Sequence, residues 1–491
     1  MAADFEPVAS LSIHTRSAVR PGSDQRSVFA DRWFGVLWPL AVLLHLAGNP
    51  AHLLSLNHIG VMQLAVVAAA VGLLVAPSGP AAVGLAGTYL VVLWLKLPVV
   101  GNHEIVLGLT ALVVLVAVMA AERIDHPDRN GDWVGAAAPT LRVMLVVAYG
   151  FMALAKWNRG FLDVVHSCAV LFGDEMLGGF GLGPGAHRPI AWLVIAASIA
   201  IETAVPILLV VRRTRLIGVP LAIGFHGFLS LDPASHIWDF SSALLPLFLL
   251  FAGAQVRARL DWFADRLHAV GRTTALGGAG LLVATQAVVL LAWIRFGTPP
   301  WPVAYPLWLA VLALVALVLF QHRVEPTVAL AGEASLELGR TARVALLAVV
   351  TMAALNGVAP YLELRSAAAF NMYSNLAVVD GTTNHLLVPA LRSTPEAPTF
   401  VRILDADGDA NLDHYHRNDL LLPAATLERH LAANPGLAPV VQRGDGPETV
   451  AAASTADGSG LLGTVVHKLG FRRAVDGAGT HRCGRAWGPL G

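Results

Sequence analysis

Charged residues are scarce in this chain of 491 residues. They make up 13% of it, against about 25% in a typical soluble protein. Hydrophobic residues make up 56%, and this composition predicts an integral membrane protein. Basic and acidic residues balance at 33 each, so the formal net charge is zero and no nucleic-acid partner is indicated.

Several sequence motifs are also missing. Cysteine occurs only twice, which excludes a disulfide-rich scaffold and a cysteine-based metal site. The eighteen histidines form no HExxH pattern and there is no Walker loop, so we expect no metal cofactor and no nucleotide. Acidic residues in 405–413 have calcium-loop spacing, but the glycine falls two places early and His416 stands where glutamate is expected. A solvated turn is the favoured interpretation there.

Long apolar runs recur between residues 33 and 360. A helix needs about 17–25 apolar residues to cross the core of a bilayer. The candidate spans are 33–48, 60–77, 81–100, 104–121, 138–158, 189–211, 215–231, 238–254, 273–296, 301–321 and 341–360. We therefore predict a mainly α protein that forms a polytopic transmembrane helix bundle of about eleven helices.

Composition divides the chain into four parts. Residues 1–31 are polar and lack the apolar stretch of a cleavable signal peptide. Residues 32–260 form the main transmembrane domain, and 261–361 add further transmembrane helices. Over residues 362–491, Asp, Asn, Thr, Gly and Pro become frequent and short alternating stretches such as 399–404 appear. This last part is predicted to be a small α+β domain outside the membrane.

The distribution of arginine predicts the orientation in the membrane. If the N-terminus is cytoplasmic, the arginine-rich loops lie inside, and the loops 49–59, 232–237 and 297–300 on the other side contain no lysine or arginine. This indicates a multi-pass protein of the cell membrane with an extracytoplasmic C-terminal domain. Cys168 and Cys483 then share the oxidising side, where they form either a disulfide or two unrelated thiols. The sequence leaves both alternatives open.

Polar side chains within or at the ends of the spans are the functional candidates, because charge is costly in lipid. These residues are Lys96, Asn102, His103, Lys156, Asn158, Glu202, His226 and His236. Most of them fall at the outer ends of their spans, which predicts an outward-facing polar pocket in the bundle. The alternative for the two lysines is that each ammonium extends to the lipid headgroups. The alternative for Glu202 is a structural pairing with a neighbouring helix.

The stretch 149–162 contains Ala-Lys-x-Asn, with Lys156 as the lysine, followed by Phe-Leu. It resembles the lysine motif of the vitamin K-dependent gamma-carboxylase family and of its bacterial relatives, the HTTM domain proteins. The resemblance covers roughly residues 30–260 and 365–395. Further segments resemble the family in the same order: Asn102-His103, 202–215, 224–226 with 240–248, and 372–376 with 384–389.

The resemblance implies an enzyme that uses vitamin K hydroquinone or menaquinol, with O2 and CO2 as co-substrates. In the family a lysine, which corresponds to Lys156 here, takes a proton from the quinol, and oxygenation of the quinol ends in an epoxide. The strong base formed on the way removes a proton from a glutamate side chain of a protein or peptide, and CO2 adds to the carbanion. His103 is the second catalytic candidate. The residues expected to bind the cofactor are Asn102, His226, Lys96 and Asn158.

Two other functions remain open. The outer domain is far smaller than in the eukaryotic carboxylases, which leaves a quinol epoxidase or oxidoreductase without carboxylation as one alternative. A non-catalytic transporter or membrane scaffold is the other. Transporters usually contain repeats and broken helices near the membrane midplane, whereas this sequence shows no internal repeat.

Overall fold

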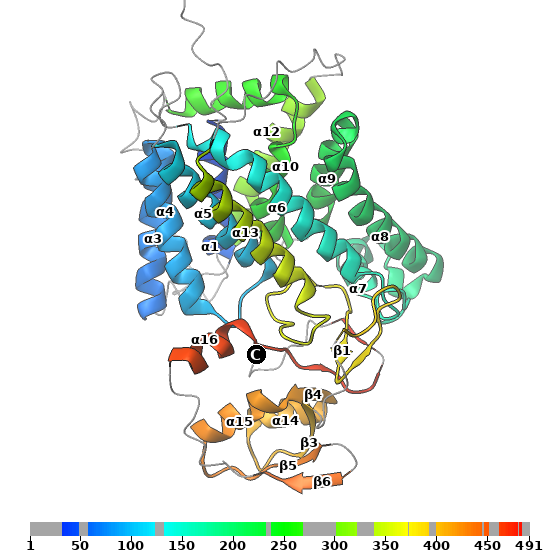
Figure 1. Cartoon of the computed structure of the whole chain (residues 1–491). Coiled ribbons are helices and arrows are strands. Elements are labelled where there is room, and N and C mark those ends of the chain that lie inside the picture. Colours follow the sequence, from blue (N-terminus) through cyan, green and yellow to red (C-terminus); the bar gives the residue numbers. More distant parts are fainter. Residues whose placement is uncertain are drawn as a thin grey trace, which may run out of the picture.

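The structure is a computed structural model, and it is mainly helical (Figure 1). A helix bundle occupies one end of the molecule and a small strand-containing region the other. The predicted span 273–296, the polar segment 1–31 and His236 lie outside the described residues. The described residues are 32–48, 57–122, 132–231, 237–268, 301–321, 338–371, 373–391, 399–443, 446–450, 461–479 and 481–483.

Ten helices of the described chain make up most of the bundle. They are α1 (Phe34–Gly48), α3 (His58–Val75), α4 (Gly79–Lys96), α5 (Asn102–Ala121), α6 (Trp133–Ala155), α8 (Arg188–Val210), α9 (Arg215–Leu229), α10 (Ile237–Leu249), α12 (Trp301–Gln321) and α13 (Arg340–Val358). Among the described residues, seven helices are long and apolar enough to cross a membrane. The number becomes eight if α10 and the helix Ala254–His268, bent by 118° relative to it, count as one span. The total of eleven therefore stays a prediction.

Helix α5 lies at the centre of the bundle, where it packs against α4, α6, α10 and α13. In the most apolar 18-residue stretch of α5, 72% of the residues are buried inside the protein, against 28% in the corresponding stretches of α3 and α4. Because α5 is almost completely enclosed by protein, polar residues near its start have protein neighbours rather than lipid. The peripheral helices instead expose large apolar side chains, such as Leu193 on α8, as a lipid-facing surface requires.

Helix α6 leads directly to the candidate site. The side chain of Asp132 caps its start by accepting a hydrogen bond from the backbone N–H of Gly135 at 2.8 Å. Its last residue is Ala155, and Lys156 is the capping residue that follows. The turn after it is fixed by Asn158, whose amide donates to the carbonyl of Ala155 at 2.7 Å and accepts from the N–H of Phe161 at 2.9 Å. The short helix α7 (Cys168–Leu177) comes next.

The C-terminal region contains a five-stranded antiparallel sheet in the order β6-β5-β3-β4-β7. Its strands are β3 (Phe400–Asp405), β4 (Leu420–Pro423), β5 (Val440–Arg443), β6 (Gly446–Thr449) and β7 (Val475–Asp476). Helices α14 (Ala410–Arg417) and α15 (Ala424–Ala433) pack on the sheet, and α16 (Leu461–Leu469) lies between it and the bundle (Figure 1). A separate core of aliphatic residues and Tyr415 supports this region. The predicted strand-containing region is thus confirmed.

The acidic stretch considered for calcium links β3 to α14. Asp409 caps α14 by accepting a hydrogen bond from the N–H of Leu412 at 2.8 Å. Asp413 forms an ion pair with Arg417 one turn later. Both carboxylates therefore have local partners, and residues 410–413 form the first turn of α14 rather than a solvated turn.

The C-terminal region is joined to the bundle next to the end of α6. A short hairpin, β1 (Val378–Val379) and β2 (Thr382–Thr383), precedes the segment that makes this contact. The N–H of Arg159 donates to the carbonyl of Asn384 at 3.0 Å, and the N–H of Leu386 donates to the carbonyl of Trp157 at 2.8 Å. The residues around the candidate site therefore come from both parts of the chain.

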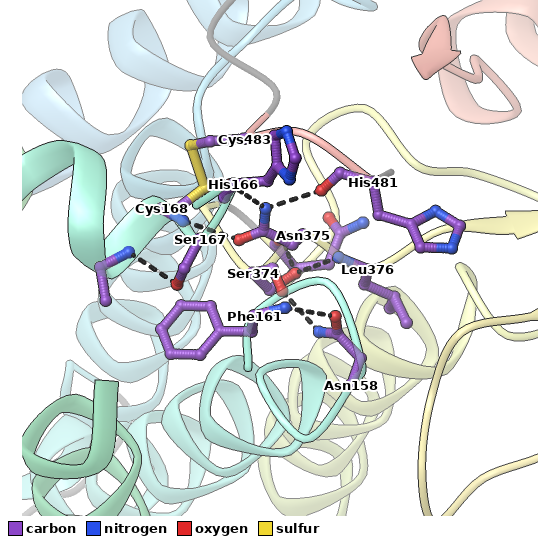
Figure 2. The surroundings of a disulfide bond; sticks show 12 residues. Asn158, Phe161, His166, Ser167, Cys168, Ser374, Asn375, Leu376, His481 and Cys483 are labelled. Carbon is purple, nitrogen blue, oxygen red and sulfur yellow. Dashed lines mark hydrogen bonds between the residues drawn. A yellow bond between two sulfur atoms is a disulfide. The ribbon is translucent and has the colours of Figure 1, made fainter. Parts of the chain in front are cut away.

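A disulfide between Cys168 and Cys483 strengthens this junction (Figure 2). Beside it, the side chain of Asn375 accepts a hydrogen bond from the N–H of Cys168 at 2.9 Å. The same side chain donates to the carbonyls of His166 at 2.9 Å and His481 at 2.8 Å. The disulfide alternative is thus confirmed, and it connects the start of α7 to the end of the described chain.

Candidate functional site

The end of α6 and the middle of α8 are joined by a buried ion pair between Lys156 and Glu202. The two side chains are 11% and 9% exposed. The hydroxyl of Ser198, one turn before Glu202, donates to the other carboxylate oxygen at 3.3 Å. The ammonium also lies 5.7 Å from the centre of the Phe161 ring. Lys156 is therefore held inside the protein, and the pairing of Glu202 with a neighbouring helix is observed.

The ion pair forms part of the wall of a cavity of about 180 Å³. The cavity is lined by α6, α7, α8 and α9, by the starts of α5 and α10, and by Tyr373 from the C-terminal region. Most of the lining is apolar and much of it aromatic. Its polar members, apart from Cys168 in the disulfide, are Asn102, Tyr149, Lys156, Ser198, Glu202, His226 and Tyr373. An apolar cavity with a few polar groups is the usual form of a small-molecule site.

Asn102, the first residue of α5, supplies an unused hydrogen-bond donor to this cavity. Its side chain is only 2% exposed, and its Nδ2 has no hydrogen-bond partner within the described part of the chain. A buried donor left without a partner costs about 1–3 kcal/mol. An acceptor atom on a bound molecule would remove this cost, which makes Asn102 a candidate ligand-binding residue.

His226 is fixed in the cavity wall through both nitrogens of its ring. Its Nε2 lies 3.2 Å from the hydroxyl of Tyr149, and its Nδ1 lies 3.2 Å from the hydroxyl of Ser241. The rings of Phe240 and Phe248 pack against it, with centroids at 5.6 Å and 5.4 Å. Tyr149 and His226 are therefore two polar side chains held in fixed positions in an otherwise aromatic part of the cavity wall.

A second buried cluster lies beside the cavity. Lys96 at the end of α4 forms an ion pair with Glu104, whose Oε1 also lies 3.3 Å from Nε2 of His45. The other ring nitrogen of His45, Nδ1, is 3.0 Å from each carboxylate oxygen of Asp239. Nε2 of His103 is 3.4 Å from Oδ2 of Asp239. This polar cluster, defined as these five residues, connects α1, α4, α5 and α10.

The residues that were expected to share one pocket thus lie in separate sites. Lys156, Asn102 and His226 line the cavity, whereas Lys96 and His103 belong to the polar cluster. Asn102 and His103 separate because successive residues of a helix point about 100° apart, at 3.6 residues per turn.

Asn158 lies in neither site. Its side chain is fully buried, and its amide donates to the carbonyls of Ala155 and Ser374 while its oxygen accepts from Phe161 and Asn384 (Figure 2). All the hydrogen bonds of this side chain therefore go to protein groups, and its place is the junction of the two parts of the chain.

Two important residues are not among those expected from the sequence. His45 stands in the apolar run 33–48, and an ionisable residue within such a run was the signal that could have identified it. Tyr373 lies far beyond the bundle residues in sequence and reaches the cavity only through folding of the C-terminal region. No pattern in the sequence indicates that contact.

Comparison of the chain with models of known protein families, with curated proteins and with solved structures gives no match. The chemistry of the cavity and the motif resemblance are therefore the observations that bear on function.

Proposed function

We propose that this protein is a membrane enzyme that binds a quinol in the cavity and uses Lys156 to take a proton from it, as the resemblance to the vitamin K-dependent gamma-carboxylase family implies. The proposal includes O2-dependent epoxidation of vitamin K hydroquinone or menaquinol. It also includes carboxylation of a glutamate-type substrate by CO2, a carbon–carbon lyase activity. The observation that carries it is the Lys156–Glu202 pair in the wall of an apolar cavity.

The cavity suits a flat apolar ring with polar substituents. Aromatic side chains such as Phe172 and Phe225 offer faces for ring packing. The free Nδ2 donor of Asn102 matches an oxygen on such a ring. When bound, a quinol supplies the electrons for reaction with O2. These residues bind and orient it, and the apolar lining keeps bulk water away.

Glu202 makes a proton-accepting role for Lys156 chemically reasonable. Lys156 accepts a proton only as a neutral amine, and a carboxylate within hydrogen-bond reach can take the proton that the ammonium must first give up. Glu202 then passes that proton on to solvent, so that its carboxylate stabilises the ammonium formed when Lys156 accepts the quinol proton, by a charge-assisted hydrogen bond. The pair therefore holds one proton that moves between two groups in a place with few other polar neighbours.

The proposal places this site near the outer face of the cell membrane. Arginine is concentrated in the loops assigned to the cytoplasm, which puts the end of α6 and the C-terminal region on the opposite side. The Cys168–Cys483 disulfide is in keeping with that side, since disulfides persist in oxidising compartments.

The test is an oxygen-consumption assay on the full chain in lipid nanodiscs, supplied with vitamin K hydroquinone or menaquinol and labelled bicarbonate. We expect Lys156→Ala to lower quinol-dependent oxygen uptake by about 10²–10⁴-fold, the usual contribution of a general base. The chain has three lysines, and Lys468→Ala is the matched control because Lys468 caps α4 away from the cavity. Full turnover in Lys156→Ala would contradict the proposal.

A second variant guards against misfolding. Lys156→Ala leaves Glu202 without its main partner, whereas Lys156→Ala with Glu202→Gln removes both charges and should fold if the single variant does not. The products separate the alternatives. Epoxide with labelled carboxylate supports the full reaction, and epoxide alone supports a quinol epoxidase. The absence of quinol turnover in the wild-type protein would favour a transporter or scaffold.

A further inference from the structure

The polar cluster has a feature that the proposed quinol chemistry does not use. We infer that His45, His103 and Asp239 form a binding site for one divalent transition-metal ion, separate from the cavity that contains Lys156. These residues come from α1, α5 and α10, so the site exists only when the three helices are packed together.

The spacing of the donor atoms suits such an ion. One nitrogen of each histidine and one oxygen of Asp239 lie within 4.8 Å of one another. Two of the separations are 3.0 Å, from Nδ1 of His45 to Asp239, and 3.4 Å, from Nε2 of His103 to Asp239. Metal–ligand bonds of about 2.0–2.2 Å require donor atoms within roughly 4.4 Å of one another. Shifts of a few tenths of an ångström therefore complete the set.

The surroundings support His45 as a metal ligand. Its second nitrogen, Nε2, faces Oε1 of Glu104 at 3.3 Å. A carboxylate in this position usually holds a metal-bound histidine in the correct tautomer and orientation. Glu104 is itself fixed by Lys96 and by the N–H of Gly101, which donates to Oε2 at 2.7 Å. The carboxylate that faces His45 is therefore held in place through both of its oxygens.

The contacts of His45 also define a metal-free state that competes with metal binding. Without an ion, His45 lies between the carboxylates of Glu104 and Asp239. Both of its nitrogens must then carry a proton, because a bare ring nitrogen would face a carboxylate oxygen and be repelled. With an ion bound, His45 loses one proton and contributes a neutral imidazole. The cluster thus holds either a proton or a metal ion at Nδ1.

His103 offers Nε2 as the third ligand atom. Its Nδ1 is buried and has no hydrogen-bond partner within the described part of the chain. Among the described residues the ring is therefore positioned by its Nε2 contact with Asp239, which a shared metal ion would bridge. Two imidazoles and one carboxylate suit zinc or ferrous iron, and three protein ligands leave a coordination position for water or a small ligand.

The experiment measures metal content, so it does not depend on quinol turnover. The full chain in nanodiscs is loaded with Zn²⁺ and, separately and without oxygen, with Fe²⁺, dialysed, and analysed by elemental mass spectrometry. We expect about one equivalent of ion per chain in the wild-type protein and at least a tenfold loss in Asp239→Asn. His187 is an exposed histidine outside the cluster, so the control variant His187→Ala should retain the ion.

The conservative variant His103→Gln keeps the test decisive if Asp239→Asn does not fold, because His103 is the least buried of the three. Cobalt substitution adds a spectroscopic readout: the visible absorption of protein-bound Co²⁺ should appear in the wild type and disappear in His103→Gln. A wild-type protein that retains less than about a tenth of an equivalent, or a His103→Gln variant that binds as well as wild type, would overturn the inference in favour of the imidazolium state.

Discussion

Two lysine–glutamate pairs of the same chemistry occupy different surroundings in this bundle. Glu202 has two partners, Lys156 and the hydroxyl of Ser198, and the pair borders an apolar cavity. Glu104 binds Lys96, faces His45 and accepts a hydrogen bond from the N–H of Gly101. The first pair is sparsely supported and faces open space, whereas the second is enclosed by other polar groups.

The difference shows how context assigns a role to the same ion pair. In a region with few polar neighbours, a ligand can change the position of the proton, because little else holds it there. In a closed polar network, each proton is shared by several groups, and the network is better suited to hold a fixed charge or an ion. The third lysine, Lys468, has neither surrounding and donates to the carbonyls of Trp94 and Leu97 at 2.8 Å each.

Removal of the lysine from each pair is the most direct test of the difference between the two sites. Lys156→Met should destabilise the protein by about 3–5 kcal/mol, because the buried Glu202 loses the charged partner with which it is paired. Lys96→Met should cost less, since Glu104 keeps His45 and the N–H of Gly101. Thermal unfolding of the two variants in the same detergent measures the difference. Equal losses would show that the extra partners of Glu104 contribute nothing.

Loss of the disulfide should affect the cavity more than the polar cluster. The Cys168–Cys483 bond closes a loop with a sequence separation of 315 residues, and its removal should cost about 2–4 kcal/mol. Cys168 and Tyr373 both line the cavity, so quinol affinity should fall together with stability. The double variant Cys168→Ser/Cys483→Ser, compared with reduced wild-type protein, tests this by unfolding and ligand titration. Retained quinol affinity would mean that the cavity keeps its shape without the bond.

Asn102 sharpens the comparison because it belongs to the cavity while its neighbour His103 belongs to the cluster. Asn102→Leu replaces an unpartnered donor by an apolar group of similar size, so the empty protein should be as stable or more stable, by up to about 1–3 kcal/mol. Quinol binding should weaken at the same time. Unfolding and quinol binding, measured on one preparation of the variant, give the change in stability and the change in affinity. A loss of stability without a loss of affinity would mean that Asn102 stabilises the fold and does not bind the quinol.

The smallest expected effect is a pH dependence at the junction beside the cavity. Nε2 of His385 donates to the carbonyl of Leu154 at 2.8 Å, while Nδ1 accepts from the N–H groups of Leu387 and Val388 at 3.0 and 2.9 Å. These bonds need the neutral ring, and burial lowers the pKa of His385 from 6.5. Because the folded-state pKa lies below that of the unfolded chain, the stabilisation is complete above about pH 6.5. It is lost as the pH falls through the folded-state pKa.

Hydrogen exchange of residues 361–391 at about pH 7.5 and pH 5.5 measures this effect. After correction for the slower intrinsic exchange of amides in acid, we expect lower protection of these amides at the lower pH in the wild-type protein. His385→Gln keeps polar contacts without a titrating ring and should remove most of the pH dependence. If the variant responds to acid as the wild type does, another group controls the junction.

The sequence identified several residues of the cavity for a clear physical reason. Lys156, Glu202 and His226 are ionisable residues in apolar runs, and such residues are rare enough in lipid-facing segments to be noticed individually. His45 follows the same rule, although its run is short. The pairing of Lys156 with Glu202 could not be predicted, because it depends on how α6 and α8 pack, and residue spacing does not encode that distance.

The sequence alone determined that this is a membrane protein with a mainly helical bundle and a small strand-containing C-terminal region. Composition and the length of the apolar runs are local properties, so they need no knowledge of packing. Only the tertiary structure decided which polar residues meet. Helix packing placed Lys156 beside Glu202 and closed the polar cluster around His45. Docking of the C-terminal region brought Tyr373 to the cavity and Cys483 to Cys168, contacts that span long stretches of the chain.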